Sequence, residues 1–238
     1  MISSGHNQCV SATMLGVSVL PHALRSLARL FDEPKPHVLM VVGTGISIGA
    51  TDDPRASWKG LLLDAVSRIE SLGIAKRELL AANRTLIEDA FTGEFKLAEI
   101  LQRAESIIEH LGGVDDSHFA NWLKDSVGAL KAKPDQRESL DAIADLAKAG
   151  ALILTTNYDS LLSEATGFDS VTWEEPDKIL EVVNRKRRGI IHIHGHWGRP
   201  SSVVLGRTSY DRIKSAALPQ TELKSLWLVW HWLYLGCG

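Results

Sequence analysis

The stretch Val38-Leu39-Met40-Val41-Val42-Gly43-Thr44-Gly45-Ile46-Ser47 decides the fold, because a short apolar run is followed at once by a glycine turn. Apolar runs of this length, rich in branched residues, are typical of strands that are buried on both faces of a parallel sheet. Two similar runs follow at Ala151-Leu152-Ile153-Leu154 and Ile190-Ile191. The sequence therefore predicts an α/β fold, a Rossmann-like parallel sheet with helices on both faces.

Between the first two predicted strands the apolar residues recur at helical spacing. A helix is also expected ahead of the first strand, over residues 20–31, and residues 1–20 are expected to be a loose N-terminal segment before a domain over 21–238. The number of helices exceeds what one crossover needs, so we expect residues 75–135 to be a helical insertion that caps a pocket. The helices predicted between the two strands begin at Ser57 and then cover residues 79–90, 96–111, 117–130 and 138–149.

The C-terminal part is predicted to alternate strands and short helices, as a doubly wound sheet requires. Strands are expected over residues 170–173, 189–194, 202–205 and 227–235, and helices over 160–165 and 209–215. The last strand enters Gly236-Cys237-Gly238, where such a sheet would continue with a helix. We therefore expect the domain to be truncated at its C-terminal end, with an apolar tail that self-associates.

Polar motifs follow three of the predicted strands: the glycine turn, Thr155-Thr156-Asn157-Tyr158-Asp159, and His192-Ile193-His194-Gly195. Ligands of open α/β sheets lie beyond the carboxyl ends of the strands, so these motifs should converge on one pocket. The glycine turn has the character of a phosphate-binding loop, in which backbone N–H groups and the following helix favour negative charge. An ordinary strand-to-loop turn is the alternative.

Asn157 and Asp159 are candidate site residues, because polar groups that are buried without partners are costly. Asp159 has a structural alternative as the N-cap of the next helix. Asn157 has no comparable alternative in the sequence, and this favours a functional role.

His192, His194 and His196 alternate, and on an extended strand they would point to the same face. Two interpretations are open. Alternating histidines are a common metal-ligand pair, and a single neutral histidine near pKa 6.5 suits general-base catalysis. We favour a general base, His194 ahead of His192, and expect no bound metal.

Composition and charge exclude several classes of protein. A net charge of −3 and a hydrophobic content of 45% are ordinary for a globular domain and do not indicate direct binding of nucleic acid. The basic run Arg185-Lys186-Arg187-Arg188 is interpreted as a solvated loop. Cys9 and Cys237 cannot form a zinc ribbon. The absence of a signal peptide and of an apolar run long enough to span a bilayer predicts a cytoplasmic protein without a membrane partner.

The order Gly-x-Gly-x-Ser, Thr-x-Asn-x-Asp, His-Gly and a final glycine-ending strand resembles the sirtuin superfamily. The resemblance implies that the chain binds NAD, with catalytic roles for Asn157 and His194. It also implies a set of NAD-binding residues: Gly43, Thr44, Gly45 and Ser47 at the pyrophosphate, Thr156 and Asp159 on the nicotinamide side, and Gly236 and Gly238 near the adenosine.

Two features of the sequence differ from the usual pattern of the sirtuin superfamily. Deacetylating sirtuins carry a four-cysteine zinc ribbon, which this chain cannot make, and their Pro-Asp-Phe-Arg stretch is replaced by Asp52-Asp53-Pro54-Arg55. This combination looks like the sirtuin-like NAD hydrolases of bacterial antiphage defence. That resemblance implies NAD as a substrate, nicotinamide and ADP-ribose as products, no zinc, and either a homo-oligomer or a partner defence or sensor protein. The alternatives are an NAD-dependent protein deacylase, a non-catalytic nucleotide-binding fragment, and a metal hydrolase built on the three histidines.

Overall fold

A five-stranded parallel sheet forms the centre of the computed structural model, which describes residues 22–33, 35–92, 96–216 and 229–237. The strands lie in the order β3-β4-β2-β1-β5 and all pair in parallel. The predicted Rossmann-like α/β fold is confirmed. The strands are β1 (Val38–Val42), β2 (Leu152–Thr155), β3 (Asp169–Thr172), β4 (Gly189–His192) and β5 (His231–Leu235).

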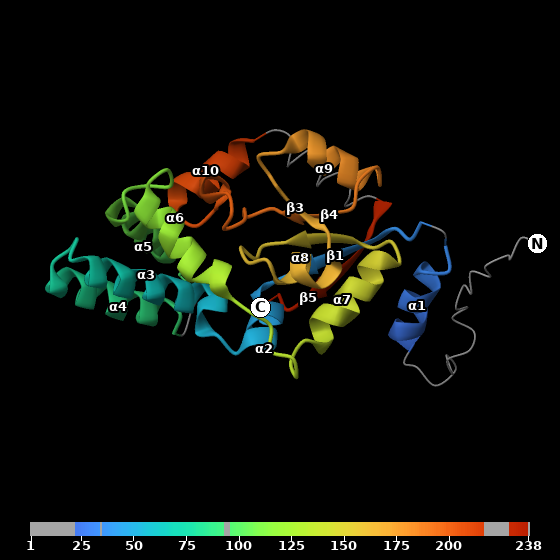
Figure 1. The fold of residues 1–238 in the computed structure, drawn as a ribbon, viewed down its shortest axis with the longest axis horizontal. Helices are drawn as coiled ribbons and strands as arrows, with labels where there is room; N and C mark the ends of the chain where they lie inside the picture. The colour runs from blue at the N-terminus through green and yellow to red at the C-terminus, as the bar shows by residue number, and fades with distance from the viewer. Residues whose placement is uncertain (1–21, 34, 93–95, 217–228, 238) are drawn as a thin grey trace, which may run out of the picture.

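Helices cover both faces of the sheet (Figure 1). Alternate residues of a strand point to opposite faces, so Met40 of β1 packs on one face and Leu39 on the other. The Met40 face is covered by α1 (His22–Leu30), α2 (Thr44–Thr51), α7 (Glu138–Lys148) and α8 (Leu161–Thr166), and the Leu39 face by α9 (Pro176–Val183).

A group of helices lies to one side of the sheet, beyond the carboxyl ends of the strands (Figure 1). It has a hydrophobic core of its own, centred on Trp122, Phe119 and Leu62. The predicted helix over residues 117–130 is interrupted at Ser126, whose hydroxyl donates to the Trp122 carbonyl oxygen at 2.6 Å. The elements are η3 (Pro54–Ala56), α3 (Trp58–Leu72), α4 (Arg77–Ala90), α5 (Leu97–His110), α6 (Ser117–Asp125), η4 (Val127–Ala129), η5 (Pro200–Ser202) and α10 (Arg207–Ser215).

Two predicted strands are corrected. Residues 203–205 are fully buried but irregular, lying between η5 and α10, because their apolar side chains join the core of the helical group instead of the sheet. The last strand begins at His231, not at residue 227, and ends at Leu235. The predicted loose N-terminal segment with Cys9, residues 227–228 of the predicted last strand, and Gly238 lie outside the described part of the chain.

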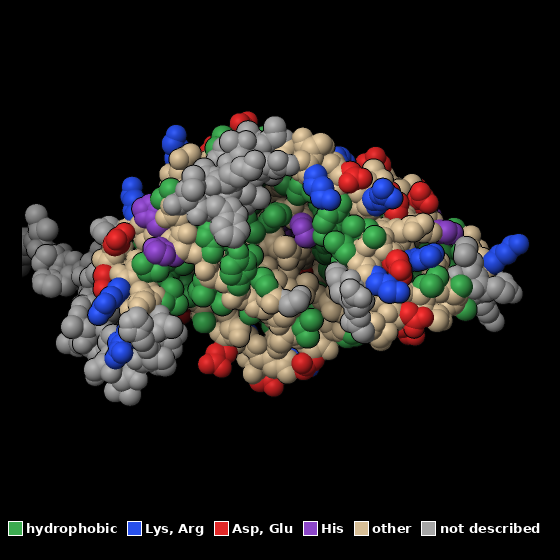
Figure 2. Space-filling model, turned by 180° about the vertical axis from the view of Figure 1, so that it is seen from behind, with side chains coloured by type: hydrophobic (Ala, Val, Ile, Leu, Met, Phe, Trp, Pro, Cys, Tyr) green, Lys and Arg blue, Asp and Glu red, His purple; other side chains and the backbone are tan. Residues whose placement is uncertain are grey.

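The surface carries charges of both signs. Figure 2 shows hydrophobic side chains gathered across the middle of the face seen there, with Lys, Arg, Asp and Glu side chains mixed toward its two ends. Of the helices that the structure describes, none has the length and apolar character needed to cross a membrane.

Candidate functional site

The carboxyl ends of β1, β2 and β4 lie side by side and bring the three predicted motifs together. Val42 of β1 pairs with Thr155 of β2, which in turn pairs with His192 of β4. The backbone continues this contact past the strands, because the Thr156 N–H donates to the Val42 carbonyl and the Ile193 N–H to the Thr155 carbonyl. The predicted convergence at one edge of the sheet is therefore present in the fold.

The glycine turn after β1 is packed against the end of β5. Gly45 N–H donates to the Gly236 carbonyl oxygen at 2.9 Å. A Cβ at Gly43 or Gly45 would lie only 2.6 or 2.9 Å from that same oxygen, and Gly236 has a φ of +62°. Glycine is thus required where the two backbones meet. This contact uses the Gly45 N–H, which is one of the N–H groups at the start of α2. The sequence did not predict that the glycine turn would have this structural role.

Asn157, Ser47 and Asp159 form a buried polar network below the glycine turn. The Asn157 Nδ2 donates to the Gly43 carbonyl at 3.1 Å and to the Ser47 hydroxyl at 2.9 Å. Ser47 in turn donates to Asp159 Oδ2 at 2.7 Å. The other Asp159 oxygen accepts from the Leu161 N–H, the first of α8, at 3.0 Å, although the N-cap position itself belongs to Ser160. Burial is the main cause of a raised pKa at Asp159.

Two acceptors in this layer are buried and have no partner among the described residues: Asn157 Oδ1 and His192 Nε2. His192 Nδ1 lies 2.9 Å from the Asn157 carbonyl oxygen, so Nδ1 carries the proton and Nε2 is a bare acceptor. Buried polar groups are nearly always paired, so each of these atoms is suited to a donor from a ligand or water.

The three histidines do not share one strand face, and this expectation was wrong. β4 ends at His192, and a turn follows in which Gly195, with a φ of +86°, donates its N–H to the His192 carbonyl at 3.1 Å. The turn redirects His194 and His196 to different surroundings. Among the described residues no group of three or more His, Cys, Asp or Glu is placed to hold a metal ion.

His196 is bound within the protein. Its Nδ1 accepts from the Gly198 N–H at 3.1 Å, so the Nε2 that lies 3.1 Å from the Ser160 hydroxyl is the protonated nitrogen. The Ser160 oxygen also accepts from the Trp197 indole N–H at 2.7 Å. His196 therefore donates to Ser160 and does not act as a base toward it.

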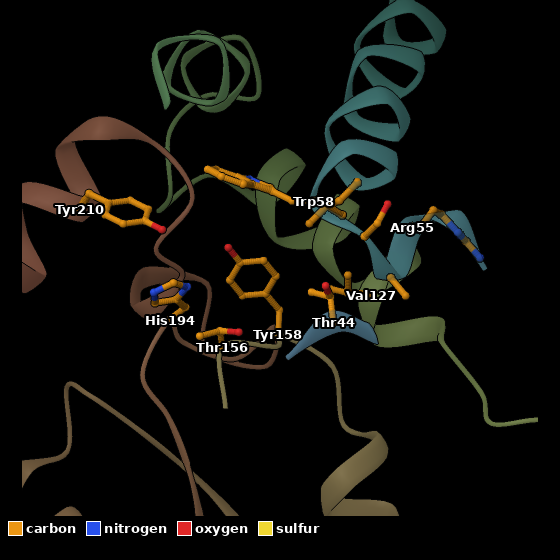
Figure 3. A pocket seen from close by; sticks show the side chains of 11 residues that line it. Thr44, Arg55, Trp58, Val127, Thr156, Tyr158, His194 and Tyr210 are labelled. Atoms are coloured by element: carbon orange, nitrogen blue, oxygen red, sulfur yellow. The ribbon is translucent and has the colours of Figure 1, made fainter. Parts of the chain in front are cut away.

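His194 lies in the wall of a pocket of about 190 Å³. Its ring lies edge-to-face with Tyr210 at a centroid distance of 5.5 Å, and burial lowers its pKa to about 4. His194 is therefore neutral at physiological pH and able to accept a proton. Figure 3 shows His194, Tyr210, Tyr158 and Thr156 turned toward the same space. The pocket is lined by Thr44, Arg55, Ala56, Ser57, Trp58, Leu61, Val127, Thr156, Tyr158, His194 and Tyr210.

The predicted site residues fall into two layers. Thr44, Thr156 and His194 line the pocket. The remaining ones lie next to it, in the turns at the strand ends, and do not line it: Gly43, Gly45, Ser47, Asn157, Asp159 and Gly236. Among the described residues of the helical insertion predicted over residues 75–135, only Val127 lines the pocket. The other lining residues outside the strand ends come from η3, α3 and α10.

Sequence reasoning missed the aromatic lining, Trp58, Tyr158 and Tyr210. Tyr158 lies inside the Asn157 motif and donates its hydroxyl to the Val204 carbonyl at 2.8 Å. Burial raises the pKa of both tyrosines, so both hydroxyls remain protonated. The only sequence signal was the position of Tyr158 between two site candidates, since isolated aromatic residues are most often core residues.

Arg55 also lines the pocket, but its guanidinium points away from the other labelled side chains (Figure 3). It donates to both carboxylate oxygens of Asp53 and to the Asp125 carbonyl. The hydrogen bonds from Arg55 are the largest influence on Asp53 and lower the pKa of that carboxyl. Arg55 therefore fixes η3, between α2 and α3, in the wall of the pocket.

The C-terminal part of the chain is similar to a known protein family. Residues 151–238 match the SIR2-like domain. The matched region holds β2, β4 and β5 and with them the Asn157, His194 and Gly236 motifs. This similarity supports a sirtuin-like domain in the C-terminal part of the chain, and with it an activity that involves NAD.

Proposed function

We propose that this protein hydrolyses the bond between nicotinamide and ribose in NAD, releasing nicotinamide and ADP-ribose. The observation that carries the proposal is a neutral histidine in the wall of an aromatic pocket, beside a layer in which two buried acceptors have no partner among the described residues. The similarity of residues 151–238 to the SIR2-like domain supports NAD as the substrate.

The residues present have the chemistry that this reaction needs. The nicotinamide ring of NAD is planar and cationic, and Trp58, Tyr158 and Tyr210 offer aromatic faces that attract such a ring. The same aromatic side chains exclude bulk water from the bond that breaks. Asn157 does not line the pocket but holds the glycine turn and Ser47 beside it, and thereby fixes the backbone next to which the ribose binds.

The reaction balances with His194 as the base. The C1′–N bond breaks and its electron pair returns to the nicotinamide ring, which leaves as a neutral molecule. The ribose passes through an oxocarbenium-like state, as in glycoside hydrolysis. A water oxygen bonds to C1′, and the proton that this water loses passes to His194 and then to solvent. Removal of NAD from an infected cell would stop its metabolism, and we propose this depletion as an antiphage role, in concert with a partner protein or further copies of the chain.

The test is nicotinamide release from NAD by the purified protein, measured by chromatography with and without an acetyl-lysine peptide. We expect release without the peptide, and a loss of at least about 100-fold in rate for His194→Ala, as for a general base. His118→Ala is the matched control, because His118 is exposed on α6, and it should leave the rate unchanged. His196→Ala should be milder than His194→Ala.

Asn157→Ala is expected to abolish the reaction as well. Asn157 is buried and donates two hydrogen bonds, so its replacement can also destabilise the fold. The unfolding temperature of the variant must therefore be compared with that of the wild type. Release that requires the peptide would show a deacylase instead. Failure of the folded wild type to release nicotinamide under any of these conditions would contradict the proposal.

A further inference from the structure

The basic turn between α9 and β4 lines a second pocket, at the opposite end of the sheet from the candidate site. β2 and β4 begin beside this pocket, at Leu152 and Gly189, whereas the candidate site lies beyond their carboxyl ends. The cavity has a volume of about 160 Å³. Its lining includes four cationic side chains, Lys148, Arg185, Arg187 and Arg188. Arg185 and Arg187 are half-buried, so the interpretation of this run as a freely solvated loop does not hold for them.

Arg185 is held firmly in this pocket, and it pairs with no carboxylate of the described residues. It adopts a φ of +59°, which is uncommon for any residue but glycine. Its guanidinium donates to the Gly150 carbonyl at 2.7 Å and to the Pro36 carbonyl, and it lies 5.1 Å from the centre of the Trp230 ring. These neutral partners fix the position of the charge and do not cancel it.

The other three cations are only partly neutralised. Arg187 pairs with Asp169 and Glu181, and its Nε is buried without a partner among the described residues. Arg188 lies 5.6 Å from the centre of the Phe168 ring, which orients its guanidinium. Neither Arg188 nor Lys148 has a carboxylate within 4.0 Å in the part of the chain that the structure describes.

We propose that this pocket binds a phosphate group. Four cations face two carboxylates around it, leaving an excess of two positive charges on a chain whose net charge is −3. A phosphate monoester carries about −1.5 to −2 at pH 7 and matches that excess. Guanidinium groups also present planar pairs of donors that fit phosphate oxygens. A phosphate group is small enough for a cavity of about 160 Å³, and the rest of a larger ligand would lie outside it.

The proposal is tested by titrating the full chain with inorganic phosphate in a calorimeter, with chloride adjusted to keep the ionic strength constant. The double variant Lys148→Gln/Arg188→Gln removes two lining charges that make no hydrogen bond with a described residue. The control Lys124→Gln/Lys186→Gln removes the same net charge from exposed side chains outside the pocket, one of them in the same turn. We expect one phosphate site, weakened at least about tenfold in the first variant, the loss expected for a charged hydrogen bond, and less than twofold in the control.

Two further probes distinguish the source of the phosphate. A free phosphomonoester is indicated if 5′-AMP binds at least as tightly as inorganic phosphate, with weak salt dependence. A nucleic-acid strand is indicated if a 12-nucleotide single strand binds more tightly and its affinity falls steeply with salt. In both cases the Lys148→Gln/Arg188→Gln variant must lose binding. The proposal is overturned if wild-type protein shows no saturable phosphate binding, or if the control variant loses as much affinity as the pocket variant. Neither result depends on NAD cleavage.

Discussion

Individual buried histidines make the stability of this protein depend on pH. Burial lowers the pKa of His192 to about 3 and those of His194 and His196 to about 4, against 6.5 in an unfolded chain. At pH values between the folded and the unfolded pKa, the unfolded state binds more protons than the folded state. The stability that the neutral histidines contribute is therefore fully present above about pH 6.5 and is lost as the pH is lowered. His192 alone should cost about 2 kcal/mol at pH 5. Urea unfolding at pH 7.5 and pH 5.0 measures the change.

The matched variant for this prediction is His192→Asn. Its amide retains a donor toward the Asn157 carbonyl and removes the titrating ring. The variant should lose about 2 kcal/mol less than the wild type between the two pH values. Asp159, whose raised pKa acts in the opposite direction, is common to both proteins and cancels in the comparison. Equal pH dependence in both proteins would show that His192 is not the group responsible.

The lowered pKa of His194 also has a kinetic consequence. A base with pKa 6.5 would be only about one quarter deprotonated at pH 6, whereas His194, with a pKa of about 4, stays neutral there. If the proposed mechanism holds, kcat/KM for nicotinamide release should be nearly flat between pH 8 and pH 6. A fall of about fourfold over that range, with the protein still folded, would assign the base to a solvated histidine.

At the scale of elements, α2 offers two glycines with opposite roles. A Cβ at Gly45 would lie 2.9 Å from the Gly236 carbonyl, whereas one at Gly49 would meet nothing within 4 Å. Gly49→Ala should raise stability by about 0.5–1 kcal/mol, the usual gain in a helix. Gly45→Ala should lower stability by about 1–3 kcal/mol, because α2 and the end of β5 must separate. Thermal unfolding of the two variants measures both changes. Similar shifts of the unfolding temperature in the two variants would mean that the end of β5 does not pack tightly against α2.

Elements that depend on a local pattern were predictable from the sequence. β1 and β2 are uniformly apolar runs, and α3 and α7 have clear helical spacing and ends. The predictions that failed concern segments whose structure depends on contacts with residues farther along the chain. Residues 203–205 are apolar and branched like a strand, but the helical core buries them in an irregular segment. The alternation of the histidines was broken by the turn at Gly195, where a Cβ would lie 2.2 Å from the Ser202 carbonyl.

At the scale of the whole molecule, β5 forms one edge of the described sheet. Its only partner strand in the described part of the chain is β1, and Tyr234 and the nearby Val229 are 54% and 60% exposed. Exposed edges with apolar side chains pair readily with another chain. We expect the protein to self-associate at micromolar concentration, and Tyr234→Lys to shift it toward the monomer in sedimentation velocity. Leu72→Lys, at the exposed end of α3, is the control and should leave association unchanged. A wild type that is already monomeric would contradict the prediction.

The sequence predicted that Asn157 and His194 lie at the same edge of the sheet, but it did not predict the lining of the pocket there. Asn157 and His194 were placed correctly at one edge of the sheet, because the carboxyl ends of parallel strands must meet there. Trp58 and Tyr210 come from α3 and α10, and no local pattern indicates that both reach the same space. The packing of the helical group against the sheet decides that, and it is a property of the complete fold.

The pairing of β1 has a consequence for synthesis on the ribosome. β1 is the second strand from the edge, and its partners β2 and β5 lie far along the chain: Val38 pairs with His231. At about 5–20 residues per second, the interval between making these two strands is roughly 10–40 s. During that time the apolar Val38–Val42 segment has an open side, and nascent chains that expose such segments are the usual clients of chaperones. β1 is thus made early, and its pairing on both sides is completed last.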